Sequence, residues 1–253
     1  MSLEYFGVLE KTNPFPIEIS QFITYLLNFG TPIETLRPFL RSRNQSNILV
    51  CFTGLPGAGK SSLLNAILSN ESLISKRVAV VAFDPSSRNG GAFLGDRVRL
   101  TNQSDDLRIF FRSIGHRGSL STLPNNLEAV ADTFFHFGYD LVFIETVGMG
   151  QTQDRLPEVF DVVVNVQTPN NGDEIQFAKS GFIEVGDIVF FNKVENESDR
   201  QIVSIFKQSI ELSRQIKEKS VRVISGSVRN LEGIDDLVRE LLKIKYIEMK
   251  PNE

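Results

Sequence analysis

The residues best suited to chemistry lie in one short glycine-rich segment of the chain. They match the P-loop pattern GxxxxGK followed by Ser or Thr, and the segment consists of Gly54, Leu55, Pro56, Gly57, Ala58, Gly59, Lys60, Ser61 and Ser62. Glycines let the backbone curl so that successive N–H groups point at phosphate oxygens, and a following helix adds the positive end of its dipole. Lys60 would reach the β- and γ-phosphates, and the Ser61 hydroxyl would bind Mg²⁺, which prefers oxygen ligands. The segment therefore predicts a nucleoside triphosphate site.

Carboxylates that follow apolar runs could complete such a site. Asp84 and Glu145 each come directly after a run of apolar residues that reads as a buried strand. Since ligands of open α/β sheets bind at the carboxyl ends of the strands, both acids are expected to face the phosphates, hold Mg²⁺ and position water. Asp96 is a third candidate ligand, and Gly148 could place its N–H against the γ-phosphate and so detect hydrolysis. A lone acid at a strand end is about as often a helix cap or a solvated loop residue.

A second polar motif, Asn192-Lys193-Val194-Glu195, follows a later apolar run. It is close to the Asn-Lys-x-Asp with which GTPases read guanine, where an acid accepts hydrogen bonds from N1–H and the exocyclic amine. Glu195 keeps the charge but is one methylene longer than Asp. A polar turn before the helix that begins near Asp199 is the alternative interpretation. GTP is favoured over ATP, and a second guanine loop is expected at Ser225, Gly226 and Ser227.

Strands and helices alternate along most of the chain. Short runs rich in β-branched and aromatic residues predict strands over 48–52, 78–83, 109–111, 141–144, 162–166, 188–191 and 221–224. Helical spacing predicts helices over 61–68, 126–137, 199–217 and 234–243. Because the strands are almost continuously apolar, the sheet is expected to be mostly parallel and covered on both faces. The predicted fold is a three-layer α/β P-loop NTPase, with residues 1–46 as a small helical N-terminal segment and 47–253 as the nucleotide-binding domain.

Composition narrows the function classes. A chain of 253 residues with a net charge of -4 and a pI near 5.4 has no general attraction for nucleic acid or anionic membranes. The single cysteine, Cys51, permits no intramolecular disulfide, which fits a reducing compartment, and it is expected to pack in the core. No signal-peptide pattern and no apolar run long enough to span a bilayer is evident, so a cytoplasmic location is expected.

Several ordered motifs together resemble one family, the MeaB/ArgK-type GTPases, which include the methylmalonic aciduria type A protein and act as chaperones of cobalamin-dependent acyl-CoA mutases. The resemblance runs through most of residues 50–240, and its motifs are GLPGAGKSS, DPSSRNGGAFLGDR, FFRSIGHRGSLS, GYDLVFIETVGMGQTQ, NNGDEIQFAKSGFIEVGD and NK-V-E. Together they are far more specific than the phosphate loop alone. The resemblance implies a GTP-hydrolysing switch, with Mg²⁺ and GTP or GDP bound, that serves a mutase such as methylmalonyl-CoA mutase.

The resemblance also implies roles for individual residues. Asp84, Asp96 and Glu145 would surround Mg²⁺ and the attacking water, while Asp173 and Lys179 would belong to a further switch segment. By their positions alone, Asp173 could equally be a charge favoured by a helix N-terminus, and Lys179 could be the solvated end of that helix.

The chain departs from the family pattern at three places. Glu195 stands where the family usually has Asp, and Ser113-Ile114-Gly115-His116 stands where it has Pro-Ser-Pro. The chain also ends soon after its last predicted helix, whereas family members commonly continue into a dimerisation extension, so a homodimer is left open.

Other functions need features that the sequence lacks or does not display. An ATP-dependent small-molecule kinase or a transport-linked ATPase would need an acceptor site. A nickel-inserting GTPase would need a cluster of His and Cys ligands, and the chain has two histidines and one cysteine. A module that binds GTP without turnover ranks lower, because each expected carboxylate is present.

Overall fold

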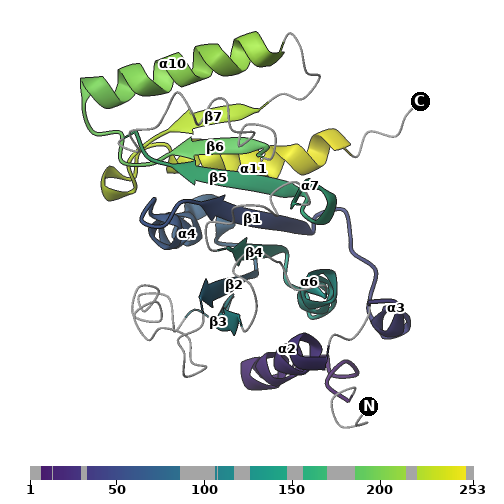
Figure 1. Ribbon diagram of the computed structural model, residues 1–253. Helices are drawn as coiled ribbons and strands as arrows, with labels where there is room; N and C mark the ends of the chain where they lie inside the picture. Colours follow the sequence, from purple (N-terminus) through teal and green to yellow (C-terminus); the bar gives the residue numbers. More distant parts are fainter. Residues whose placement is uncertain are drawn as a thin grey trace.

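A seven-stranded sheet forms the centre of the protein (Figure 1), in a computed structural model that describes residues 7–12, 14–29, 33–85, 106, 108–116, 126–146, 156–169, 186–214 and 221–248. The strands are β1 (Ile48–Gly54), β2 (Val78–Pro85), β3 (Ile109–His116), β4 (Leu141–Glu145), β5 (Val162–Gln167), β6 (Ile188–Phe191) and β7 (Arg222–Ser225). Their order is β3-β2-β4-β1-β5-β6-β7, and every neighbouring pair is parallel. The predicted parallel α/β fold is confirmed.

Helices cover both faces of this sheet. They are α2 (Pro16–Phe29), α3 (Ile33–Leu36), η1 (Arg37–Phe39), α4 (Lys60–Leu68), η2 (Glu71–Leu73), α6 (Leu127–His136), α7 (Leu156–Val159), α10 (Glu197–Arg214), η5 (Val228–Asn230) and α11 (Ile234–Glu248). On β1, Leu49 and Cys51 pack into one apolar cluster with α2 and α6, whereas Val50 and Phe52 pack into a second cluster with α4 and α11. All residues of β1 are buried, which explains why the first five, Ile48 to Phe52, are all apolar. No described helix is both long enough and apolar enough to cross a bilayer.

Aspartates at the amino edge of the sheet fix how neighbouring strands line up. Asp161, which precedes β5, accepts a hydrogen bond from Leu49 N of β1 at 2.7 Å. Asp187, which precedes β6, accepts one from Val163 N of β5 at 2.8 Å. A one-residue slip would turn each strand's side chains to the opposite face, so these contacts help to hold the register. The carboxyl ends of β1 and β5 therefore lie at a defined level, where the candidate site is built.

Helix α2 is built into the core that α6 also lines. Phe22, Ile23 and Leu26 of α2 are fully buried. Arg112 of β3 donates hydrogen bonds to α2 at the Ser20 carbonyl and the Thr24 hydroxyl. The predicted helical N-terminal segment thus shares an apolar core with the sheet, and the domain boundary at residue 47 stays a prediction.

His136 of α6 ties two further N-terminal segments to the same core. Its Nδ1 accepts a hydrogen bond from Arg41 N at 2.9 Å, and its Nε2 lies 2.8 Å from Leu9 O. Since Nδ1 accepts, Nε2 carries the proton and donates it to that carbonyl. The buried imidazole is therefore a structural contact.

The element boundaries differ from the predicted ones at a few places. Strand β3 runs on to His116, beyond the predicted end at 111, because it pairs with β2 all the way to Pro85. Helix α10 begins at Glu197, ahead of the predicted start at Asp199. The short helix α7 was not predicted, since four residues are too few for helical spacing to be recognised.

Candidate nucleotide-binding site

The glycine-rich loop joins β1 to α4 at the carboxyl edge of the sheet. Gly54, Gly57 and Gly59 have φ angles of 136°, 79° and 93°, which side chains rarely allow. A Cβ added to Gly54 would lie 2.1 Å from Val166 O, and one added to Gly59 would lie 2.4 Å from Asn192 Nδ2. The backbone conformation and the fixed Val166 carbonyl both require glycine at position 54, and at position 59 the backbone conformation favours it.

Lys60 lies inside this loop at the start of α4. Its Nζ donates hydrogen bonds to Gly54 O at 2.9 Å and to Leu55 O at 3.2 Å, and the residue is 9% exposed. Burial lowers the pKa of Lys60, and the nearby Glu145 carboxylate partly opposes this fall. A buried ammonium held by backbone carbonyls is suited to neutralise phosphate oxygens.

Ser61 and Glu145 meet beside the loop. The Ser61 hydroxyl donates a hydrogen bond to Glu145 Oε1 at 2.8 Å. Glu145 ends β4, and its register partners are Phe52 on β1 and Ala82 on β2. Two oxygen-bearing side chains from separate elements therefore converge next to Lys60, and an all-oxygen donor pair fits the ligand preference of Mg²⁺.

The structure describes only some of the predicted site residues. The backbone of Asp84 lies near the end of β2, but its side chain is outside the described part of the chain. The candidate residues that lie wholly outside the described ranges are Asp96, Gly148, Asp173 and Lys179.

Asn192 joins three segments at the end of the site where a base contact is predicted. It is 3% exposed, and its Nδ2 donates to Ala58 O of the phosphate loop at 2.8 Å. Its Oδ1 accepts from Lys193 N at 2.9 Å and from Val228 N, which follows β7, at 3.0 Å. Lys193 extends the link, because its Nζ donates to Gly57 O at 2.8 Å. The sequence motif predicts a contact with the base. It does not predict the hydrogen bonds from Asn192 and Lys193 to the phosphate loop.

The segment after β7 packs tightly against the same turn. Gly226 N donates to Phe191 O at 2.8 Å, and Gly226 O accepts from Val194 N at 3.0 Å. A Cβ on Gly226 would lie 2.0 Å from Glu232 O, so only glycine fits there. Ser227 is 1% exposed, and its hydroxyl has no hydrogen-bond partner within the described residues. Both predicted guanine loops thus lie together at the carboxyl ends of β6 and β7.

Asp199 is a buried acid at this turn, and its spacing in the sequence predicts only the start of a helix. It is 4% exposed, and its Oδ2 accepts hydrogen bonds from Glu195 N at 2.9 Å and Asn196 N at 3.2 Å. The Asn-x-x-Asp spacing of residues 196–199 resembles a helix capping box and could have indicated the contact. The Glu195 side chain is exposed.

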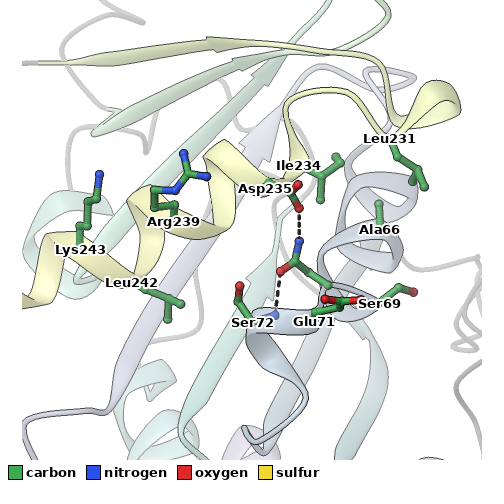
Figure 2. Close-up of a pocket in the computed structure, with 11 residues that line it drawn as sticks. Ala66, Ser69, Glu71, Ser72, Leu231, Ile234, Asp235, Arg239, Leu242 and Lys243 are labelled. Carbon is green, nitrogen blue, oxygen red and sulfur yellow. Dashed lines mark hydrogen bonds between the residues drawn. The ribbon is translucent and has the colours of Figure 1, made fainter.

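A separate groove lies between α4 and α11, with a volume of about 890 Å³. Asn70 Nδ2 donates a hydrogen bond to Asp235 Oδ1 at 2.7 Å. Figure 2 shows Asp235 together with Ala66, Leu231 and Leu242 among the residues that line the groove. None of the residues that line it is a predicted nucleotide-site residue. The groove is therefore distinct from the phosphate loop.

Comparison with known proteins shows which family this chain belongs to. The family model described as "Methylmalonyl Co-A mutase-associated GTPase MeaB" matches residues 33–250. The chain belongs to this family. The resemblance drawn from the motifs is confirmed, and the family model reaches well beyond the P-loop.

Individual relatives of this MeaB-family chain differ in length. A Pyrococcus abyssi protein named as a GTPase is 40% identical over 150 residues, which are 59% of this chain and 46% of that protein. The "Fused isobutyryl-CoA mutase" of Nocardia farcinica is 32% identical over 236 residues, which are 89% of this chain and 22% of that protein. The chain spans about half the length of the Pyrococcus relative.

A solved structure supports the fold. The crystal structure of a protein titled "LAO/AO transport system kinase" superposes with a TM-score of 0.55 at 21% identity, covering 97% of this chain and 75% of that one. At this identity the likeness bears on the fold alone.

Proposed function

We propose that this chain binds GTP with Mg²⁺ at the P-loop and hydrolyses it, and that its nucleotide state acts on a cobalamin-dependent acyl-CoA mutase such as methylmalonyl-CoA mutase. The observation that carries the hydrolysis is the 2.8 Å contact between Ser61 Oγ and Glu145 Oε1 beside the buried Lys60. It brings a hydroxyl and a carboxylate together beside the Lys60 ammonium, which bonds to the loop carbonyls of Gly54 and Leu55.

Hydrolysis of a γ-phosphate depends mainly on positioning and charge neutralisation. The loop glycines turn their N–H groups toward the phosphates, and the Lys60 ammonium offsets the charge that develops on them. Ser61, Glu145 and the predicted ligands Asp84 and Asp96 would hold Mg²⁺. When bound, Mg²⁺ neutralises phosphate charge and orients the phosphate oxygens.

Guanine selectivity would come from the turn after β6. The exposed Glu195 carboxylate would accept hydrogen bonds from the guanine N1–H and exocyclic amine, a donor pair that adenine does not offer. Asn192 supports this role indirectly, because it holds the turn against Ala58 of the phosphate loop at 2.8 Å. The base end and the phosphate end of the nucleotide would thus be read by one rigid unit.

The mutase as partner is supported by the family and by one relative. The family description itself names association with methylmalonyl-CoA mutase. The Nocardia protein named as a fused mutase contains a segment that is similar to this chain and makes up 22% of its length. A separate GTPase chain would need a binding surface to act on a mutase, whereas a fused one is held by its covalent link.

Nucleotide titration tests the proposed binding. In Mg²⁺, we expect GDP to bind at least about tenfold more tightly than ADP, because only guanine satisfies the acid at Glu195. Lys60→Ala should lose most of the affinity for both, and Leu231→Ser, in the separate groove, should lose none. Equal affinity for GDP and ADP would refute guanine selectivity.

Co-purification tests the proposed partner. Purified chain mixed with methylmalonyl-CoA mutase should form a complex whose amount differs between a non-hydrolysable GTP analogue and GDP. Lys60→Ala should abolish that difference. A mutase that is never retained, with either nucleotide, would count against the partner and leave the nucleotide chemistry standing.

A further inference from the structure

The turn after β6 has an acceptor for every backbone N–H from residue 192 to residue 196. Neighbouring segments and the first side chain of the turn hold the first three of these amides. The hydrogen bonds are Asn192 N to Gln167 O at 2.8 Å, Lys193 N to Asn192 Oδ1 at 2.9 Å and Val194 N to Gly226 O at 3.0 Å. The turn is therefore fixed to β5 and to the segment after β7 before it reaches Glu195.

The last two amides depend on one side chain. Asp199 Oδ2 accepts from Glu195 N at 2.9 Å and from Asn196 N at 3.2 Å. In return, Asp199 N donates to Asn196 Oδ1 at 2.9 Å, which completes a reciprocal cap on α10. Asp199 is 4% exposed, so these contacts are shielded from water. A hydrogen bond is electrostatically stronger in such surroundings than in water.

The turn needs the support of Asp199 more with Glu at position 195 than it would with the shorter Asp. Lys193 has a φ of 62°, a left-handed conformation that bends the turn just before Glu195. Glu195 is exposed and carries one methylene more than Asp, so its carboxylate can sweep a wider volume. A bidentate contact with a base requires that the backbone below the carboxylate does not move as well.

We infer that Asp199 is a positioning residue for base recognition, which holds the Glu195 backbone so that the longer carboxylate can meet both guanine donors. The inference rests on the proposed guanine binding and assigns a specificity role to a residue outside the Asn-Lys-x-acid motif. Asp199 does not contact the base. It acts through the Glu195 amide, and its effect should therefore depend on the base.

Inosine diphosphate separates base reading from general stability. IDP lacks the exocyclic amine, so Glu195 can accept two hydrogen bonds from GDP and one from IDP. If the cap only stabilises the fold, its loss weakens the binding of both nucleotides by the same factor. A residue that orients Glu195 changes the GDP-to-IDP preference itself.

The matched control lies in the same cap. Asn196→Ala removes the bond from Asp199 N to Asn196 Oδ1 but keeps the bond from Glu195 N to Asp199 Oδ2. Asp199→Ala removes the bonds that Glu195 N and Asn196 N donate to Asp199 Oδ2 and keeps the Asp199 N donor. Asp199→Asn keeps a carbonyl oxygen in the position of the acceptor and serves as the conservative rescue. Asp199→Ser, which retains a shorter capping oxygen, replaces Asp199→Ala if that variant does not fold.

The experiment measures GDP and IDP dissociation constants in Mg²⁺ for each variant, together with Tm. We expect a wild-type preference for GDP of about tenfold. Asp199→Ala or Asp199→Ser should reduce it at least about threefold, while Asp199→Asn and Asn196→Ala should retain it even where Tm falls.

The outcomes separate the inference from the proposed function. An unchanged GDP-to-IDP preference in Asp199→Ala, or in its Ser replacement, would overturn the positioning role and leave guanine binding intact. The same loss of preference in Asn196→Ala would also overturn it, since the cap as a whole would then be responsible. A wild-type chain that prefers ADP to GDP would overturn both.

Discussion

Lys60 carries its charge in surroundings that disfavour charge. Burial lowers the pKa of this lysine, and the Glu145 carboxylate counteracts part of the fall. A bound triphosphate would bring further negative charge within reach and favour the ammonium form again. Nucleotide binding at this loop is therefore expected to be linked to proton uptake.

GDP affinity should fall as pH rises through the lowered pKa of Lys60. Above that pKa, the free protein must take up a proton to bind, because the complex favours the charged form. Lys60→Arg keeps its charge at alkaline pH, so its affinity should change less. GDP titration from neutral pH up to the ordinary lysine pKa of about 10.5 tests this, and the titration of guanine itself is common to both proteins. Parallel profiles would contradict a role for the Lys60 charge.

Glu145→Gln should reduce GTP turnover by about a hundredfold or more, because the amide neither binds Mg²⁺ as well nor accepts equally from Ser61. The Mg²⁺ concentration for half-maximal turnover should rise in parallel. Glu240→Gln is the matched control, because it removes a carboxylate that pairs with Lys243 on α11. If Glu145→Gln kept wild-type turnover, the Ser61 and Glu145 pair would not be the metal site.

At the scale of elements, the sheet was the most predictable part. Strands such as β1 are buried on both faces, so their sequences are continuously apolar and visible without any partner. The second half of β3 was not predictable, because Ser113 and Gly115 join the strand only through their register with β2.

The candidate site also has a part that the sequence predicts and a part that it does not. Lys60, Ser61 and Glu145 could be predicted because a contiguous motif and a strand end mark them. The link from Asn192 to Ala58 and Val228 could not, since it joins three segments that are distant in sequence. The role of Asp199 also depends on local geometry that spacing only suggests.

Phe22→Ala tests whether α2 is part of the core. The side chain is 0% exposed, so we expect the variant to lose about 3 to 4 kcal/mol of unfolding free energy. Phe15→Ala, at a position 72% exposed beside the same helix, should change it by less than about 0.5 kcal/mol. Urea denaturation measures both. Equal stabilities of the two variants would mean that α2 does not contribute to the folded core.

At the scale of the molecule, the phosphate loop sits at the centre of the sheet. Strand β1 lies between β4 and β5, neither of which is next to it in the chain (Figure 1). Chain connections leave β1 toward β2 on one side and β4 toward β5 on the other, and ligands of α/β sheets bind at such switch points. Nucleotide binding should therefore stabilise the whole sheet.

Cys51 provides a probe for that stabilisation. It is the single cysteine and is 0% exposed, and burial raises its pKa to about 12. A thiol reagent at neutral pH should react with it only after the sheet opens. Saturating Mg²⁺ and GDP should slow labelling, because the nucleotide binds the folded state. Lys60→Ala should remove this protection, and rapid labelling of the native protein would contradict the burial.

The loop at Gly54 to Ser61 is proposed to hydrolyse GTP rather than ATP. Steady-state phosphate release from each nucleotide, measured separately in Mg²⁺ with Lys60→Ala in parallel, tests it most directly. We expect kcat/KM for GTP to exceed that for ATP by at least about tenfold, and Lys60→Ala to lose the activity. Equal or faster turnover of ATP, or GTP turnover that survives Lys60→Ala, would contradict GTP hydrolysis at this loop.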